Sequence, residues 1–423
     1  MSAINDILNN VPIPKMVKVR QNFESSVLEN VDTELKNQLA NKNFNRKFTP
    51  GMSIAVTAGS RGVANMALTI RTVCDFPKEL GCKPFIIPAM GSHGGSTAEG
   101  QRMILSSFGI TEETMGVPIV SSMEAVCIYE FEDGFKVYVD KNAHEADGIV
   151  VINRVKPHTS FRGVYESGLM KMMTVGMGKQ LGADQIHAAG PKVMGKNIER
   201  GGKKILELEN IICGVALLEN SYNQTCGIYV LEPQQIIDQE PLLQEQAKKN
   251  MPHLMFEKPD VLAIDYIGKN ISGPGMDPNI THTFNPNSGI STEGKAHRII
   301  VFDLTEETHG AGDGVGNADF TTKRLYSKFD TAQTYPNLLT AGFPEPGKMP
   351  MLLDNQKLTI QAAIKTAALT DSSQVRMVRI KDTLHLGEIE ISEAMLPEAK
   401  ALENIEILSE PYELNFNEDG DLF

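Results

Sequence analysis

The sequence predicts an α/β protein of two α/β domains with mostly parallel sheets. The chain has 423 residues, which is more than one ordinary domain holds. Hydrophobic residues make up 41% of the chain, enough material for a sizeable core. From about residue 50 onward, short β-branched runs alternate with helical patterns. This alternation is typical of strand–helix–strand units around a parallel sheet.

Apolar runs followed by polar loops define the expected strands of the first half. They are MSIAVTA (52–58), KPFIIPAM (83–90), GIVVINR (148–154) and NIICGVALLEN (210–220). Helices are expected after the first two of these strands, and a β-rich stretch lies before the third. The helical pattern at 233–252 then leads to a new strand at 258–268.

The second domain is expected to begin at this new strand. The N-terminal domain would therefore cover residues 1–254, and the C-terminal domain would cover 255–423. A ligand site is expected in the cleft between the two domains. Further strands are expected at 296–304, 374–382 and 388–395, whereas the tail NFNEDGDLF is expected to fray.

Composition excludes several classes of function. A formal charge of −13 argues against a nucleic-acid partner, because phosphate binding needs a basic face. The five cysteines are scattered and form no CxxC pair, which favours a reducing, cytoplasmic location. The N-terminus lacks the pattern of a signal peptide, and no apolar run reaches the length of a membrane span.

Three of the expected loops carry a polar side chain of a catalytic type. Arg61 lies in GSRG, His93 in GSHGG and His158 in KPHTS. Ligands of an open parallel sheet bind outside the carboxyl ends of the strands, so these loops are expected to share a site. The small residues beside them would offer backbone N–H groups to an anion. These small residues are Ser60, Gly62, Gly94, Gly95 and Ser96.

Each feature also has an ordinary structural interpretation. A lone histidine is more often a hydrogen-bonded structural residue than a base or a ligand. Lys171, in GLMKMM, taken alone is best explained as a lysine whose stem packs on a methionine-rich helix. The stretch GPKVMGKN (190–197) nearly matches a phosphate loop, but it has Asn197 where a hydroxyl is needed and no strand before it. Metal motifs of the HExxH type and GxSxG elbows are absent from the sequence.

The ordered set of motifs resembles the nickel-dependent lactate racemase family. GSHGG matches the family's Gly-Thr-His motif, and PHTS matches its Pro-His motif. Lys171 in SGLMKMMTVGMG corresponds to the lysine that carries the cofactor, and His187, 16 residues later, to the nickel-binding histidine. Arg61 corresponds to an upstream arginine, and AGDGVGNADF resembles a Gly/Asp motif of the second domain.

This resemblance implies a racemase or epimerase that inverts C2 of a 2-hydroxy acid by hydride transfer. The cofactor would be a nickel-pincer nucleotide, a pyridinium mononucleotide that holds nickel through sulfur and carbon and is supplied by cofactor-maturation enzymes. Lys171 would carry the cofactor covalently. Two alternatives are attachment to Lys179 and binding of the cofactor without a covalent bond. His187 would bind nickel, and His93 and His158 would be acid and base. Arg61 would pair with the substrate carboxylate or polarise its oxygen.

Departures from the family pattern bear on the substrate. Ala58 stands where the lactate enzyme has an aspartate, and Met170 precedes the lysine in place of an arginine. In the second domain Thr281, His282 and Asn285 stand loosely where that enzyme has a Tyr-Gln pair and a lysine. We therefore expect a larger hydroxylated acid, such as a sugar acid, bound by His282, Asn285 and His309, in place of lactate.

Two other functions remain open on the sequence. One is an oxidoreductase on the same scaffold with an ordinary nucleotide or metal cofactor. The other is a non-catalytic anion- or metal-binding protein, in which the histidines only hold a metal.

Overall fold

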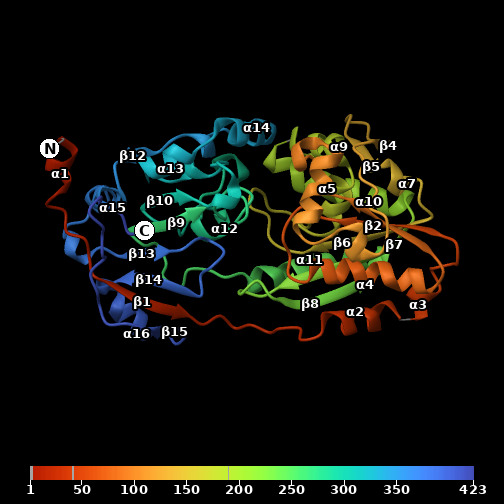
Figure 1. Ribbon diagram of the computed structural model, residues 1–423, viewed down its shortest axis with the longest axis horizontal. Coiled ribbons are helices and arrows are strands. Elements are labelled where there is room, and N and C mark those ends of the chain that lie inside the picture. The colour runs from red at the N-terminus through yellow and green to blue at the C-terminus, as the bar shows by residue number, and fades with distance from the viewer. Residues whose placement is uncertain (1–2, 41, 189) are drawn as a thin grey trace. The chain divides into compact units, whose positions relative to one another are not determined.

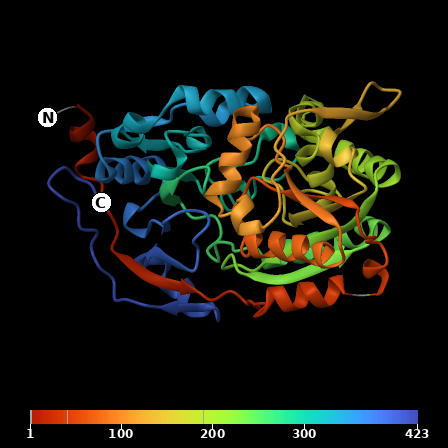
Figure 2. The same ribbon diagram turned by 45° about the vertical axis from the view of Figure 1, so that its right-hand side comes forward.

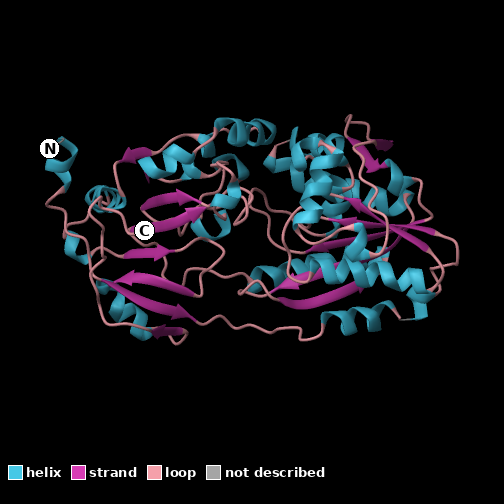
Figure 3. Cartoon of the chain, viewed as in Figure 1, coloured by secondary structure: helices cyan, strands magenta, loops and turns pink. Residues whose placement is uncertain are grey.

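The computed structural model describes residues 3–40, 42–188 and 190–423. The chain divides into two compact units. The N-terminal unit is Ser25–Met251, and the C-terminal unit combines the residues up to Glu24 with Pro252–Phe423. Each unit has strands with helices packed around them, as Figure 3 shows by colour. The predicted α/β class is therefore confirmed for both units.

The observed division differs from the predicted one at the N-terminus. The strand β1 (Met16–Gln21) pairs antiparallel with β14 (Glu388–Ser392) and with β15 (Ile405–Ile407). Red β1 lies among the blue C-terminal strands in Figures 1 and 2. Along β1 the buried Val17 and Val19 flank the exposed Lys18, so one face of the strand completes the core of the C-terminal unit. The predicted boundary at 254 lies close to the observed one at 251.

Five strands form the sheet of the N-terminal unit. The four strands that were predicted in the first half of the chain are among them. The strands are β2 (Ser53–Ala58), β3 (Lys83–Pro88), β6 (Gly148–Arg154), β7 (Ile211–Glu219) and β8 (Thr225–Leu231). Their order is β3-β2-β6-β7-β8, and neighbours run parallel except for the antiparallel pair β7 and β8.

Helices and a hairpin surround this sheet. The hairpin joins β4 (Ala125–Glu130) to β5 (Lys136–Asp140). The helices are α2 (Val31–Leu39), α3 (Lys42–Asn45), α4 (Met66–Glu79), α5 (Ala98–Ser107), α6 (Glu112–Met115), α7 (Lys141–His144), α8 (Leu169–Lys171), α9 (Lys179–Ala188), α10 (Pro191–Leu208) and α11 (Pro233–Asn250).

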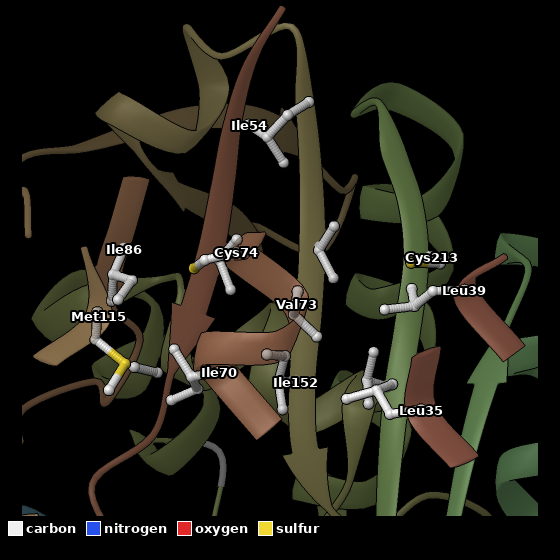
Figure 4. Close-up of a cluster of buried hydrophobic side chains, with 14 of the residues drawn as sticks. Leu35, Leu39, Ile54, Ile70, Val73, Cys74, Ile86, Met115, Ile152 and Cys213 are labelled. Atoms are coloured by element: carbon white, nitrogen blue, oxygen red, sulfur yellow. The ribbon is translucent and has the colours of Figure 1, made fainter. Parts of the chain in front are cut away.

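Alternate residues of the strands face two separate cores. Ile54 and Ile152 point into a cluster with side chains of α2 and α4, which Figure 4 shows. Ala55 and Val151 belong to a second cluster, which contains the methionine-rich segment around Lys171. Since successive side chains of a strand point to opposite faces, the two clusters lie on opposite faces of the sheet. The central strands are therefore buried on both faces, as parallel sheets require.

The C-terminal unit has an eight-stranded sheet of order β12-β11-β10-β9-β13-β14-β1-β15. Pairs from β12 through β13 are parallel, and pairs from β13 through β15 are antiparallel. The remaining strands are β9 (Val261–Ile267), β10 (Arg298–Leu304), β11 (Phe320–Thr322), β12 (Met351–Leu353) and β13 (Met377–Ile380). The helices are α1 (Ala3–Leu8), α12 (Pro278–Thr281), α13 (Lys323–Lys328), α14 (Thr331–Ala341), α15 (Gln356–Thr366) and α16 (Leu396–Ala401).

The C-terminal tail is ordered, contrary to the prediction that it frays. The ring of Phe423 lies 5.1 Å from that of Tyr266, centroid to centroid, and Arg324 donates to the carbonyl of Phe423. The N–H of Leu422 donates to Gln356 over 2.5 Å. The terminal aromatic and aliphatic side chains thus pack against the core of the C-terminal unit. This packing could not be predicted, because the neighbouring residues in the sequence are polar.

Among the described residues, no helix combines the length and the apolarity that a membrane crossing requires. All five cysteines are described, and each is a free thiol.

Candidate active site

The three predicted loops follow neighbouring strands at one edge of the N-terminal sheet. Arg61 comes after β2, His93 after β3 and His158 after β6. Because β3, β2 and β6 are adjacent and parallel, their carboxyl ends lie at the same edge. The topology therefore brings these loops to the part of an α/β sheet where ligands bind.

Lys171 ends the short helix α8 and leads into a π-helical turn. This turn, labelled η2, covers Met172–Gly176 and is followed by α9, which carries His187. Met170 and Met173 are buried in the second of the two hydrophobic clusters. A π-helical turn inside a helical segment is uncommon and is frequent at functional sites.

All three loops contact this lysine-bearing segment. A Cβ added to Gly59, after β2, would lie 3.2 Å from the methyl carbon of Met172. The N–H of Gly91, after β3, donates to the carbonyl of Gly176 over 3.1 Å. Asn153, at the end of β6, donates its amide to the carbonyl of Gly168 over 2.8 Å. The segment 168–176 thus contacts all three loops.

His158 and Lys171 are in direct contact. Nε2 of His158 lies 2.6 Å from Nζ of Lys171, and the backbone N–H of Ser160 donates to Nδ1 of His158 over 3.0 Å. Since Nδ1 accepts a hydrogen bond, a neutral imidazole carries its proton on Nε2. That proton must point at Nζ, so Nζ accepts and Lys171 is an uncharged amine in this arrangement.

The electrostatic surroundings agree with an uncharged Lys171. Burial, then the nearby charges of Arg61 and Lys156, lower the pKa of Lys171 to about 7. Burial, then the nearby Lys171, lower the pKa of His187 to about 4. The pKa of His158 falls well below its usual range because of burial, with Lys171 and His187 adding to the effect. Arg61, His158, Lys171 and His187 therefore form one electrostatically coupled cluster.

A buried acid anchors the backbone of His158. The carboxylate of Glu166, which is fully buried, accepts from the N–H of His158 over 2.8 Å. Arg162 donates to the carbonyl of His158 over 2.6 Å, and Lys248 lies 3.3 Å from the other oxygen of Glu166. The ring of Phe161 lies 4.2 Å from the imidazole, centroid to centroid. His158 is therefore held by its backbone and by its ring.

His93 lies on the exposed part of its loop. Its Nδ1 is 2.8 Å from the carbonyl of Met90, which fixes the ring on its own turn. The loop is tied to α9, because Ser96 donates to the side chain of Gln180 and to the carbonyl of Ser92. His93 thus belongs to a loop that is connected to the helix of His187.

The predicted cofactor-binding small residues fall into two groups. Gly94, Gly95 and Ser96 have φ of 69°, 62° and 56°, and Gly94 lies so close to Gly100 that a Cβ would meet its backbone carbonyl carbon at 2.5 Å. The hydroxyl of Ser96 bonds within the protein, so it is not directed to a ligand here. Ser60 is half-buried and Gly62 is exposed, on either side of Arg61.

Lys179, the alternative attachment point, is enclosed. Its side chain is fully buried, its Nζ lies 2.7 Å from Oδ2 of Asp140, and it donates to the carbonyl of Pro88. An ammonium in such a pair has no open approach for a cofactor. Of the two lysines considered for the tether, only Lys171 contacts the other site residues.

The comparisons with known proteins point to one family. Residues 8–194 match the family model of the lactate racemase N-terminal domain. The N-terminal part of the chain is lactate racemase-like. The fold is similar to that in the "Structure of the lactate racemase apoprotein from Thermoanaerobacterium thermosaccharolyticum", with a TM-score of 0.57 and 13% identity. This similarity covers 87% of the present chain and 98% of that chain. Among curated proteins, none matches.

The lactate racemase-like segment contains Arg61, His93, His158, Lys171 and His187. GPKVMGKN lies at its end and forms the start of α10 directly after α9. The stretch therefore follows a helix, whereas the phosphate-loop motif follows a strand. In the described ranges, no group of three or more His, Cys, Asp and Glu side chains is arranged to hold a metal.

The predicted substrate residues lie outside the matched segment, in loops of the C-terminal unit. His282 ends α12 with φ 56°, and burial lowers its pKa. Asn285 accepts from the N–H of Asn287 over 2.8 Å, which is a local capping bond. His309 ends a single helical turn after β10 with φ 50° and is exposed. Their role in substrate binding stays a prediction.

Two buried acids of the site were not found from the sequence. Besides Glu166, Glu240 of α11 is fully buried and accepts from the N–H of Met170 over 3.0 Å. Burial raises the pKa of Glu240 to about 8. Both acids lie on helical or loop patterns that look like ordinary solvated surface. Only the spacing of Arg162 and Glu166 offered a signal, and that spacing is common in exposed helices.

Proposed function

We propose that the protein is a racemase or epimerase that inverts C2 of a 2-hydroxy acid. The inversion would proceed by hydride transfer with a nickel-pincer nucleotide as cofactor. The observation that carries the proposal is the uncharged Lys171 beside His158, inside the segment that matches the lactate racemase N-terminal domain. The coupled Arg61 and His187 supply further groups that such a reaction needs.

The residues fit the cofactor chemically. An uncharged amine can be acylated, which an ammonium cannot, so Lys171 is suited to carry the cofactor covalently. His187 has a neutral imidazole at neutral pH, the form that binds a metal. Imidazole together with sulfur donors suits nickel, and those sulfur donors would belong to the nucleotide. When bound, the cofactor supplies a site that accepts a hydride from C2 and returns it.

The protein's own residues would bind the substrate and move its hydroxyl proton. The guanidinium of Arg61 matches the geometry of a carboxylate and would hold the acid group. His93 and His158 would take the hydroxyl proton on one side and return it on the other, so that both enantiomers are served. The flat 2-oxo intermediate would stay bound between these two steps.

Acylation of Lys171 would also release His158. In the present arrangement Nε2–H of His158 points at the lone pair of Lys171. An amide or thioamide nitrogen is a poor acceptor, because its lone pair is delocalised. Attachment of the cofactor would therefore leave Nε2 of His158 available to the substrate hydroxyl. Covalent loading and assembly of the acid–base pair would be one event.

We propose a hydroxylated acid larger than lactate as substrate. Ala58 removes a carboxylate that the lactate enzyme has near its arginine, and His282, Asn285 and His309 offer polar groups for additional hydroxyls. A sugar acid epimerised at C2 fits this set. The free thiols support the predicted cytoplasmic location, where the cofactor-maturation enzymes would act on the chain.

The nickel content of the purified protein tests the proposal. The chain is co-expressed with cofactor-maturation enzymes, beside His187→Ala and the matched control His144→Ala. His144 pairs with Glu209 on the surface of the same unit, so it reports unspecific loss of a histidine. We expect near-stoichiometric nickel in the wild type and in His144→Ala, and loss of nickel in His187→Ala. Equal nickel in both variants would exclude His187 as the ligand.

A further inference from the structure

We propose that Lys171 of the cofactor-free protein is an imine-forming amine, which captures small anions that carry a reactive carbonyl. The ligands would be aldehyde acids and 2-oxo acids. This inference concerns the chain before any cofactor is attached. It does not depend on nickel or on the proposed racemisation.

The first support is the geometry at Nζ. Ser160 N–H occupies Nδ1 of His158, so Nε2–H donates to Nζ over 2.6 Å, and Lys171 is an unprotonated amine whose one lone pair becomes available when this hydrogen bond opens. A lysine needs this lone pair to attack a carbonyl carbon. Nearby cations favour the same state, because a second positive charge beside Arg61 and Lys156 is unfavourable.

Two other lysines of the unit, Lys179 and Lys204, have a different environment. Nζ of Lys179 is paired with Asp140 in the interior at 2.7 Å. Lys204 lies 2.6 Å from Glu207, which favours its charged form and raises its pKa. Lys171 instead has an imidazole as its hydrogen-bond partner. It is therefore chemically distinct from lysines that carboxylates keep charged.

The charges around Lys171 select an anion. The positive charges of Arg61 and Lys156 act on Lys171. A carboxylate placed beside the carbonyl would pair with these cations. The loops after β2 and β3 are rich in small residues, which allows a compact anion to approach the backbone.

The bond changes of the capture balance without a further reactant. Nζ of Lys171 attacks the carbonyl carbon, and a C–N bond forms while the carbonyl oxygen becomes a hydroxyl. The hydroxyl then leaves as water, for which Nε2–H of His158 can supply the proton. The proton lost from nitrogen restores the imidazole. In sum, both amine hydrogens leave with the carbonyl oxygen as water, and a C=N bond remains.

Reductive trapping tests the inference on protein made without maturation enzymes. The probe is glyoxylate with cyanoborohydride, which reduces the C=N bond to a stable carboxymethyl amine. Peptide mapping of the wild type should show Lys171 modified roughly tenfold or more faster than Lys204, because only an uncharged amine attacks a carbonyl and Glu207 keeps Lys204 charged. Lys171→Arg should remove this fast modification, and Lys204→Met should keep it.

Three outcomes would overturn the inference or part of it. Modification spread over the lysines without preference for Lys171 would contradict it, as would an unmodified Lys171 peptide beside a modified Lys204. Propionaldehyde, a neutral probe, should modify Lys171 more slowly than glyoxylate; equal rates would disprove the selection of anions. The mapping uses wild-type protein, so it decides even if Lys171→Arg does not fold. Failure of nickel loading leaves this result unaffected.

Discussion

Nζ of Lys179 lies 2.7 Å from Oδ2 of Asp140, and both side chains are fully buried. Lys179 begins α9, Asp140 ends β5, and the same ammonium donates to the carbonyl of Pro88 at the end of β3. One interior charge pair therefore connects the loop of His93 with the helix of His187. We expect this pair to hold the two segments together.

Replacing Lys179 by methionine should destabilise the protein by ~3–5 kcal/mol, because it leaves the carboxylate of Asp140 buried without a partner. Chemical unfolding measures the loss. The double variant Lys179→Met/Asp140→Asn should recover part of it, since the amide oxygen can still cap α7. The control Lys203→Met, in an exposed pair with Glu199, should change stability by less than ~1 kcal/mol. Equal effects at both sites would refute the account.

The free energy of unfolding is expected to depend on pH because of the buried Glu240. Burial raises its pKa from 4.5 to about 8 in the folded protein, so the folded state favours the protonated acid. The stabilising contribution is then fully present below pH 4.5 and is lost as the pH rises through about 8. One pKa unit corresponds to ~1.4 kcal/mol, so the total change amounts to several kcal/mol.

The isosteric variant Glu240→Gln isolates this contribution, because glutamine does not ionise and still accepts from Met170. Unfolding free energies of both proteins should be compared at about pH 5 and at about pH 8.5. We expect wild type to lose stability relative to the variant as the pH rises. A constant difference across this range would show that Glu240 does not titrate with folding.

Gly176, in the segment that the three loops contact, has no room for a larger side chain. An added Cβ would lie 2.6 Å from Sδ of Met172 and 2.7 Å from the carbonyl oxygen of Ala89. Gly176→Ala should therefore displace the loop of His93 and destabilise the protein by ~1–3 kcal/mol, measured by thermal unfolding. Gly62→Ala is the control, since its Cβ would have only Phe108 nearby, at 3.9 Å. Similar melting temperatures of the two variants would contradict the close packing.

His93→Gln and His158→Gln should keep nickel but lose turnover. A positioned acid or base contributes about 10²–10⁴-fold to a rate, so each variant should fall by that factor in kcat for the acid found by screening. Nickel content and the inversion rate are measured on the same preparations. A variant that loses nickel together with activity would mark that histidine as part of the metal or cofactor site instead.

The path of the C2 hydrogen separates hydride transfer from proton abstraction. Inversion in D2O should give product that keeps its original hydrogen at C2, because a hydride held by the cofactor does not exchange with water. Nuclear magnetic resonance of the product reports this directly. Deuterium at C2 in the inverted product would contradict the hydride mechanism.

The sequence predicted the elements that local patterns determine. The strand at 148–154 is β6 over the same residues, and the loops with Arg61, His93 and His158 lie at one sheet edge. These results follow from apolar runs and from the rule for parallel sheets. Contacts between distant segments were not accessible in this way.

The errors of prediction arose from such distant contacts. The strand Met16–Gln21 alternates locally, but its pairing with Glu388–Ser392 is set by another part of the chain. Phe423 packs on Tyr266 although its neighbours are polar. The burial of Glu166 and Glu240 likewise depends on α11 and the loop of His158 coming together. No local pattern distinguishes such acids from exposed ones.

The mass of the peptide that contains Lys171 shows directly whether the cofactor is attached to this lysine. The protein is co-expressed with cofactor-maturation enzymes that are shown to load a known lactate racemase, digested, and compared with Lys171→Arg. We predict an added nucleotide mass on Lys171 in the wild type, and an unmodified site in the variant. An unmodified Lys171 peptide from wild-type protein that nevertheless contains nickel would contradict the covalent role of Lys171.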